Sequence, residues 1–262
     1  MTGCRAPLFP TPPTEERAAQ FCAENEPVAE SAHFAVHRVP NGLAAAEVAA
    51  EMEAVVRALR GWLPPEALPQ ARACRVVVYG AEEAEGRRFI RHRSLSGRAA
   101  GVAGLDMNLI VAAGRPSEAR LLTVLRHEAV HWSLHRQNAR PLPFWVNEGV
   151  AALLEEGVRA DGTPLPNPER RSCVRRNRET ARQGIRRVLA MAPFEPGDRR
   201  DYAWAWALVH WQYVTRPREA SPRDDAHEGT GYPGLQLPWW LDELHADRAE
   251  DYAAAVLRAL GQ

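Results

Sequence analysis

The pattern of apolar and polar residues predicts a small β-sheet in the first half of the chain. The stretch AHFAVHRV alternates between apolar and polar residues, and RVVVY is rich in β-branched residues, as strands are. We expect strands over residues 32–39, 75–79, 99–105 and 108–112. The last two are expected to be joined by a tight turn at Asp106-Met107.

Apolar residues at helical spacing lie between these strands and continue after them. We expect helices over 43–63 and 81–91, which gives the order β-α-β-α-β-β and a sheet with helices packed on it. The next helix is expected to begin after Ser117, a suitable N-cap residue, and to end before Pro141 and Pro143. Its apolar face begins with the leucines and valine of residues 121–125.

The second half of the chain is predicted to be mostly helical. Helices are expected over 143–155, 172–191, 201–215, 237–244 and 249–260, with surface loops at 158–170 and 216–234. The first 30 residues are rich in proline and then in charge, which predicts an extended tail with a short helix at 14–24.

These elements predict an α+β fold in three parts. Residues 1–30 form the tail, residues 31–137 an α/β upper lobe with a small mixed sheet, and residues 138–262 a mostly helical C-terminal lobe. The upper lobe ends in the helix that follows Ser117, and we expect a cleft across that helix.

The balance of charge argues against nucleic acid or an anionic membrane surface as a partner. Basic and acidic residues both number 33, so the net charge is zero. Every basic residue is arginine, and clusters such as Arg175-Arg176 are interpreted as a solvated helix face rather than a binding patch. No run of 18 apolar residues occurs, so no transmembrane segment is expected. The sequence does not indicate an oligomeric state.

The four cysteines, Cys4, Cys22, Cys74 and Cys173, form no C-x-x-C pair, so a structural zinc knuckle is not expected. A disulfide stays open, although Cys74 lies in a strand-like run and is interpreted as a buried apolar residue. The first 20 residues lack the apolar core of a signal peptide. Thr2-Gly3-Cys4 resembles the end of a lipoprotein cleavage site, so two localisations remain: an exported protein lipid-anchored at Cys4, or a cytoplasmic one.

The candidate chemistry begins with the motif His127-Glu128-Ala129-Val130-His131, which matches H-E-x-x-H. Two histidines four residues apart lie on one face of a helix, and both imidazoles can reach one tetrahedral zinc ion. Glu128 can then hold a water molecule on the metal and accept its proton. The motif alone is a weak signal, and its meaning depends on a third ligand.

Glu148 is the candidate for that third ligand. It lies 17 residues after His131 in the segment WVNEGVAALLE, so a turn and an antiparallel helix would return it to the metal. His135 is also on the face of His131, but one zinc ion cannot take histidines from three consecutive turns, so we expect a side chain at the helix end. Asn147 is expected either to orient a ligand or substrate or to cap the second helix.

The motif HEAVH followed by WVNEGVAALLE resembles the glutamate zincins, or gluzincins, of the peptidase MA-like superfamily, including its uncharacterised bacterial members. This resemblance implies a zincin-like fold and a zinc-dependent metallopeptidase that acts on a peptide or protein. It also implies one Zn²⁺ per chain, with His127, His131 and Glu148 as ligands and Glu128 as general base. The spacer before Glu148 is slightly shorter than in aminopeptidase members, so the match is to the broad superfamily.

The resemblance suggests further roles, each with a structural alternative. Gluzincins commonly supply a tyrosine or histidine that stabilises the oxyanion, and Tyr202 and His210 are the candidates here; the alternative is that both belong to the core. The small residues of 99–104 form either a substrate-binding edge strand or a strand packed tightly on a helix. Glu155 or Asp201 is expected to hold a histidine ligand from behind.

Two other functions remain open from the sequence. One is a catalytically silent binding or scaffold protein on the same fold, and the other is a zinc hydrolase of a non-peptide amide, because a fold does not determine a substrate. The presence of His127, Glu128, His131 and Glu148 together argues against a silent site.

Overall fold

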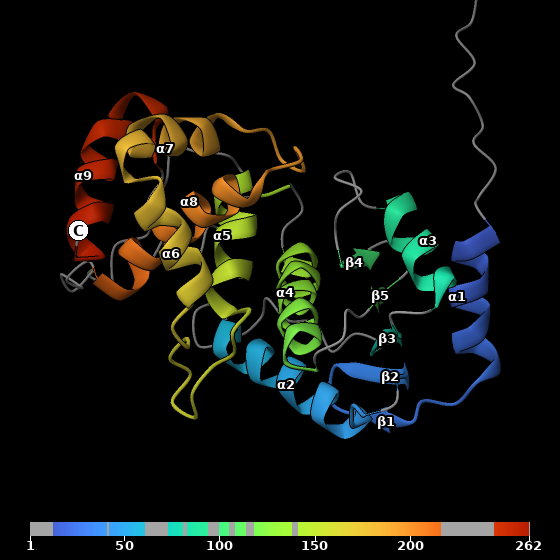
Figure 1. Cartoon of the computed structure of the whole chain (residues 1–262). Helices are drawn as coiled ribbons and strands as arrows, with labels where there is room; N and C mark the ends of the chain where they lie inside the picture. The colour runs from blue at the N-terminus through green and yellow to red at the C-terminus, as the bar shows by residue number, and fades with distance from the viewer. Residues whose placement is uncertain are drawn as a thin grey trace, which may run out of the picture.

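A computed structural model describes residues 13–40, 42–60, 73–80, 83–93, 100–104, 108–113, 118–137, 141–215 and 244–261. These residues form a lobe built on a sheet and a helical lobe, with helix α4 between them (Figure 1). The predicted turn at Asp106-Met107, the Ser117 cap, Cys4, the loop at 216–234 and nearly all of the helix at 237–244 lie outside the described residues.

The predicted mixed sheet is confirmed. Its strands run in the order β1-β2-β3-β5-β4 and comprise β1 (Ala29–Glu30), β2 (Phe34–Arg38), β3 (Cys74–Tyr79), β5 (Leu109–Ala113) and β4 (Gly101–Gly104). The central pairs β2–β3 and β3–β5 are parallel, whereas β1–β2 and β4–β5 are antiparallel. Strand β5 is buried throughout, and β4 forms an edge of the described sheet.

Helices cover both faces of the sheet, because alternate strand residues point to opposite sides. Val76, Val78 and Ile110 pack in the main core with α2 (Ala45–Arg60) and α4 (Glu118–Gln137). Val77, Tyr79, Leu109 and Val111 pack in a second cluster with α1 (Pro13–Glu24) and α3 (Ala84–Arg93).

Helix α1 changes the prediction for the N-terminal segment. The short helix expected at 14–24 is confirmed as α1, but the extended tail expected over residues 1–30 is wrong from residue 13 onward, where the chain is part of the folded lobe. Ala18 and Cys22 are buried against the sheet, and Ala29–Glu30 pairs with β2 as strand β1. The apolar spacing of Ala18, Phe21 and Cys22 gives α1 a face that the sheet covers.

The helical lobe is organised around α5 (Phe144–Leu154). All of its residues except Glu148 are buried, as its almost continuous apolar sequence requires. It packs most extensively on α8 (Arg199–His210), and Gly149 permits this approach, since a Cβ atom there would lie 2.5 Å from the carbonyl oxygen of Ala205. Helices α7 (Ala181–Ala190) and α9 (Ala249–Ala259) pack around this pair (Figure 1).

The single helix predicted over 172–191 is wrong, because two helices occupy this part of the chain. Helix α6 (Pro168–Arg176) starts inside the predicted loop, where the Asn167 side chain accepts a hydrogen bond from the Arg170 N–H. It ends at Asn177, whose backbone and side chain both donate to the carbonyl oxygen of Cys173. A 3₁₀ turn, Arg178–Thr180, then leads into α7.

The remaining expectations concern the cysteines and the membrane. Cys22, Cys74 and Cys173 are all buried, and none of these three forms a disulfide. Among the helices within the described ranges, none combines the length and apolar character that a membrane crossing needs.

Candidate metal centre

Helices α4 and α5 bring together the three predicted metal ligands. His127 and His131 lie one turn apart on α4, with ring centroids 4.7 Å apart, and Glu148 projects toward them from α5. The Oε2 atom of Glu148 is 3.3 Å from Nε2 of His127 and 3.4 Å from Nε2 of His131. One possible ligand atom from each residue lies within 4.8 Å of the other two, so this cluster can hold a metal ion.

The hydrogen bonding of the cluster fits a metal better than it fits a closed polar network. The Oε2 atom of Glu148 is buried and has no hydrogen bond of acceptable geometry, although both ring nitrogens face it. A buried carboxylate oxygen without a partner is costly and rare in folded proteins. Two imidazole nitrogens and one carboxylate oxygen that converge on one point are a typical donor set for a transition metal.

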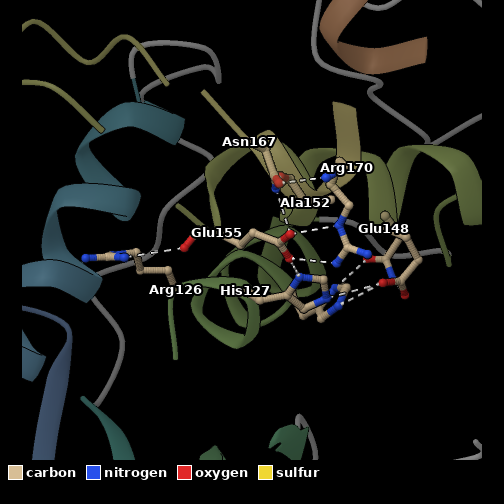
Figure 2. A network of polar contacts seen from close by, with 9 residues as sticks. Arg126, His127, Glu148, Ala152, Glu155, Asn167 and Arg170 are labelled. Atoms are coloured by element: carbon tan, nitrogen blue, oxygen red, sulfur yellow. Dashed lines mark hydrogen bonds and ion pairs between the residues drawn. The ribbon is translucent and has the colours of Figure 1, made fainter. Parts of the chain in front are cut away.

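Glu155 contacts the Nδ1 side of the His127 ring and orients it. This identifies Glu155, rather than Asp201, as the carboxylate that supports a histidine of the cluster. Its Oε2 atom lies 3.0 Å from Nδ1 of His127, on the side of the ring opposite Glu148 (Figure 2). Asp201 has a different role, since it pairs with Arg187 at 2.8 Å and completes the capping box of α8. A carboxylate on Nδ1 fixes the tautomer of a ligand histidine and leaves Nε2 for the metal.

Glu155 is itself held by two partners from the start of α6. Its Oε1 atom accepts hydrogen bonds from Nδ2 of Asn167 and Nε of Arg170, both at 2.8 Å. Nη2 of Arg170 donates to Oε2 at 3.1 Å, so the arginine grips both carboxylate oxygens (Figure 2). Arg126, next to His127 in sequence, donates to the backbone carbonyls of Glu155 and Glu156, which directly follow α5.

Asn147 performs the corresponding role for His131. Its Oδ1 atom lies 3.1 Å from Nδ1 of His131, while its Nδ2 donates to Oε1 of Glu148 at 3.2 Å. One amide orientation satisfies both contacts. The alternative that Asn147 caps the second helix is wrong, because Pro143 occupies the N-cap position of α5.

Electrostatics favour a positive charge at the centre. Burial would raise the pKa of Glu148, but the two histidines lower it far below its usual range. Burial alone would lower the pKa of His127, but its contacts with Glu148 and Glu155 outweigh this and raise the pKa to about 10. In the metal-free protein the carboxylates therefore retain a proton on His127, which a metal ion has to displace.

Glu128 lies between the two histidines in sequence and points toward the edge strand β4. Its carboxylate accepts a hydrogen bond from the backbone N–H of Ala103, and burial raises its pKa. Gly101 makes room for it, since a Cβ atom there would lie 2.9 Å from Cγ of Glu128 and 2.6 Å from a methyl group of Val124. The predicted tight packing of the small-residue strand on a helix is thus confirmed, while its use as a binding edge stays a prediction.

The structure brings Tyr202, but not His210, to the candidate metal cluster. The Tyr202 ring lies 6.4 Å from the His127 ring, and the Arg170 guanidinium lies 5.6 Å from its centroid. Burial and then the charges of Glu148 and Glu128 raise the pKa of Tyr202, which keeps its hydroxyl protonated as a donor.

His210 lies about two turns beyond Tyr202 along α8, or about 12 Å at 1.5 Å per residue. Its ring contacts that of Trp206 at a tilt of 43°, with centroids 4.9 Å apart, and burial, reinforced by the charge of Arg171, lowers the pKa of His210. None of its contacts among the described residues reaches His127, His131 or Glu148, so the expectation of a catalytic His210 is not supported by its position.

Two features of the centre escaped the sequence analysis. Arg170 was placed in a loop, although Asn167-Pro168 is a helix-start signal that puts Arg170 in the first turn of α6. His135 was expected to be a plain helix-end side chain, but its ring stacks on Phe194 at 5.2 Å with an interplanar angle of 13°. Burial, reinforced by nearby His131, lowers the pKa of His135 to about 4, so its ring is neutral at neutral pH.

Comparison with known proteins adds no relative to this description. No family model, no curated protein and no solved structure matches the chain.

Proposed function

We propose that this protein is a zinc-dependent metallopeptidase of the gluzincin type, with a zincin-like fold. The observation that carries the proposal is the convergence of Nε2 of His127, Nε2 of His131 and Oε2 of Glu148 on one buried point. The supporting contacts of Glu155 and Asn147 leave both Nε2 atoms available for a metal. Glu128, the expected base, is close enough to His131, His127 and Glu148 for their charges to act on its carboxylate, and it is not one of the three residues of the cluster.

Zinc is the metal that this donor set fits best. Two imidazoles and one carboxylate hold catalytic zinc in tetrahedral sites whose fourth position is left for water or substrate. When bound, the ion polarises the substrate carbonyl and lowers the pKa of a water molecule toward neutrality.

The chain's own residues then have separable roles in hydrolysis. Glu128 accepts a proton from the attacking water, whose oxygen bonds to the carbonyl carbon, and delivers that proton to the amine as the C–N bond breaks. The Tyr202 hydroxyl donates a hydrogen bond to the oxyanion of the tetrahedral intermediate. The substrate adds as an extended strand to the outer edge of β4, which contacts Glu128 at Gly101 and Ala103.

The test compares the wild-type protein with Glu128→Gln. Glutamine keeps the shape of the side chain but cannot accept a proton at neutral pH, so we expect normal zinc content and a loss of hydrolysis of at least about 10²–10⁴-fold. Both proteins are loaded with zinc, measured by elemental analysis, and incubated with a diverse peptide library that is read by mass spectrometry. His131→Ala is the metal-binding control and should lose its zinc.

Each outcome of this experiment has a distinct meaning. Cleavage by the wild type alone supports the peptidase. Equal cleavage by Glu128→Gln indicates a contaminating protease. No cleavage by either zinc-loaded protein rejects the peptidase and favours a binding protein or a hydrolase of another amide.

A further inference from the structure

Phe194, in the connection between α7 and α8, combines two unusual properties. Its backbone has φ of 64°, a left-handed conformation that residues other than glycine and asparagine rarely adopt. Its side chain is 46% exposed, although phenylalanine is normally buried. Backbone conformations of this strained kind cluster at functional sites, so the surroundings of Phe194 bear on function.

The ring of Phe194 contacts helix α4, which carries the two histidines of the candidate metal cluster. It stacks nearly parallel on the His135 imidazole, with centroids 5.2 Å apart. His135 follows the ligand His131 by four residues, so the two lie one helical turn, or about 6 Å, apart along α4. We call Phe194 and His135 the aromatic pair.

The same connection also contacts the start of α5 through Gly197. Gly197 packs directly on Phe144, since a Cβ atom at Gly197 would lie 2.7 Å from Cζ of Phe144. The Phe144 ring in turn contacts the ring of Tyr202 at 5.8 Å. The connection between α7 and α8 therefore contacts α4 through the Phe194 ring and contacts Phe144, the neighbour of Tyr202, through Gly197.

We propose that the aromatic pair is a substrate subsite that receives an aromatic or large aliphatic side chain next to the scissile bond. This inference rests on the proposed function. A substrate that lies along the metal ligands toward the C-terminal end of α4 would meet the exposed face of Phe194 about one turn beyond His131. The pair offers that side chain an apolar surface with no charge, since the His135 ring is neutral. Apolar side chains gain free energy when such a surface is covered, and aromatic rings stack favourably on it.

The test measures substrate preference rather than activity alone. Peptides that differ only in phenylalanine, leucine or alanine at each position flanking the cleaved bond are compared by kcat/KM. We expect the wild type to favour phenylalanine or leucine at one of these positions by about tenfold, the lower end of the range for apolar pockets, because the pair is half-exposed.

Three variants separate the ring from the backbone. Phe194→Gly removes the ring and suits the left-handed φ, so it should fold at least as well as the wild type and lose the preference. Phe194→Tyr keeps the stacking surface and should retain the preference. Val28→Ala removes another exposed apolar side chain, 63% exposed beside strand β1 in the sheet lobe, and should change nothing.

The outcomes distinguish this inference from the proposed function. A wild type that cleaves nothing overturns both. Cleavage with the same preference in wild type and Phe194→Gly, at equal zinc content, overturns the subsite alone. A preference lost in Phe194→Gly and kept in Phe194→Tyr supports it.

Discussion

Replacing Glu155 with glutamine should weaken metal binding without touching a metal ligand. The Glu155 carboxylate accepts from four donors: Nδ1 of His127, Nδ2 of Asn167, and two nitrogens of Arg170. Glutamine has a single acceptor oxygen, so either orientation of its amide points an NH₂ group at donors that the carboxylate now satisfies. If the oxygen stays with Arg170, His127 loses the partner that fixes its tautomer.

Two magnitudes follow from this geometry. Loss of a carboxylate that supports a ligand histidine typically costs about 10–100-fold in metal affinity. Stability should also fall, because Arg170 is largely buried and Glu155 is its ion-pair partner. Breaking a buried pair on one side costs about 3–5 kcal/mol, and we expect about 3 kcal/mol here because glutamine retains one acceptor.

The assay measures zinc affinity by competition with a chromophoric chelator, and stability by urea unfolding of the metal-free protein. Asp201→Asn is the matched control, since Asp201 is also buried and also binds an arginine, Arg187, through both oxygens. That variant should lose stability yet bind zinc as the wild type does. A folded Glu155→Gln protein with wild-type zinc affinity would refute the supporting role of Glu155. If Asp201→Asn also lowered zinc affinity, a loss of stability alone would be enough to weaken zinc binding.

Three further predictions follow from the structure. Tyr202→Phe should lower kcat by about 10²–10³-fold with zinc content unchanged, if its hydroxyl stabilises the oxyanion; activity equal to wild type would return Tyr202 to a packing role. Gly101→Ala should displace the Glu128 side chain, because the new Cβ would lie 2.9 Å from its Cγ, so kcat should fall more than zinc affinity does in chelator competition. Burial raises the pKa of Cys22 to about 11 and of Tyr79 to about 12, both above their unfolded values, so stability should be full below about pH 9 and decline as pH rises toward 12. In urea unfolding across this pH range, Cys22→Ala should reduce the loss of stability in its first part. A wild-type protein whose stability does not fall would contradict the raised pKa values of Cys22 and Tyr79.

The elements of the fold were largely predictable from the sequence, because their apolar patterns are strong. Strands β2 and β3 and helices α2, α4 and α5 occur within a few residues of their predicted positions. The errors arose where local polar contacts or long-range packing decide the structure. The break between α6 and α7 depends on Asn177, whose side chain bonds back to Cys173, and such a residue reads equally well as a position on a polar helix face.

The residues of the candidate metal cluster could be identified from the sequence, because the spacing of the two histidines is set by the helix itself, whereas the residues that contact them could not. His127 and His131 share one face by helical geometry, and Glu148 could be placed by a turn between two helices. Glu155 and Asp201 could not be distinguished from the sequence as the carboxylate that supports a histidine, because the choice depends on how α8 packs. Asp201 is excluded only by its contacts with Arg187 and the N-terminus of its own helix. Phe194 carried no signal at all in the sequence, since its left-handed backbone and its contact with His135 are tertiary features.

The residues of the candidate metal centre lie close together in the sequence, and this affects how the protein folds. The three residues of the candidate metal cluster, and the two residues that contact its histidines, all lie between His127 and Glu155, and the widest of these contacts spans 28 positions. By contrast, the parallel pairing of β2 with β3 joins Val36 to Val76. Closing a shorter loop costs less conformational entropy, and contacts between near neighbours in sequence form faster. We therefore expect the α4–α5 hairpin to assemble before the sheet during refolding, and zinc added to the unfolded chain to accelerate that step.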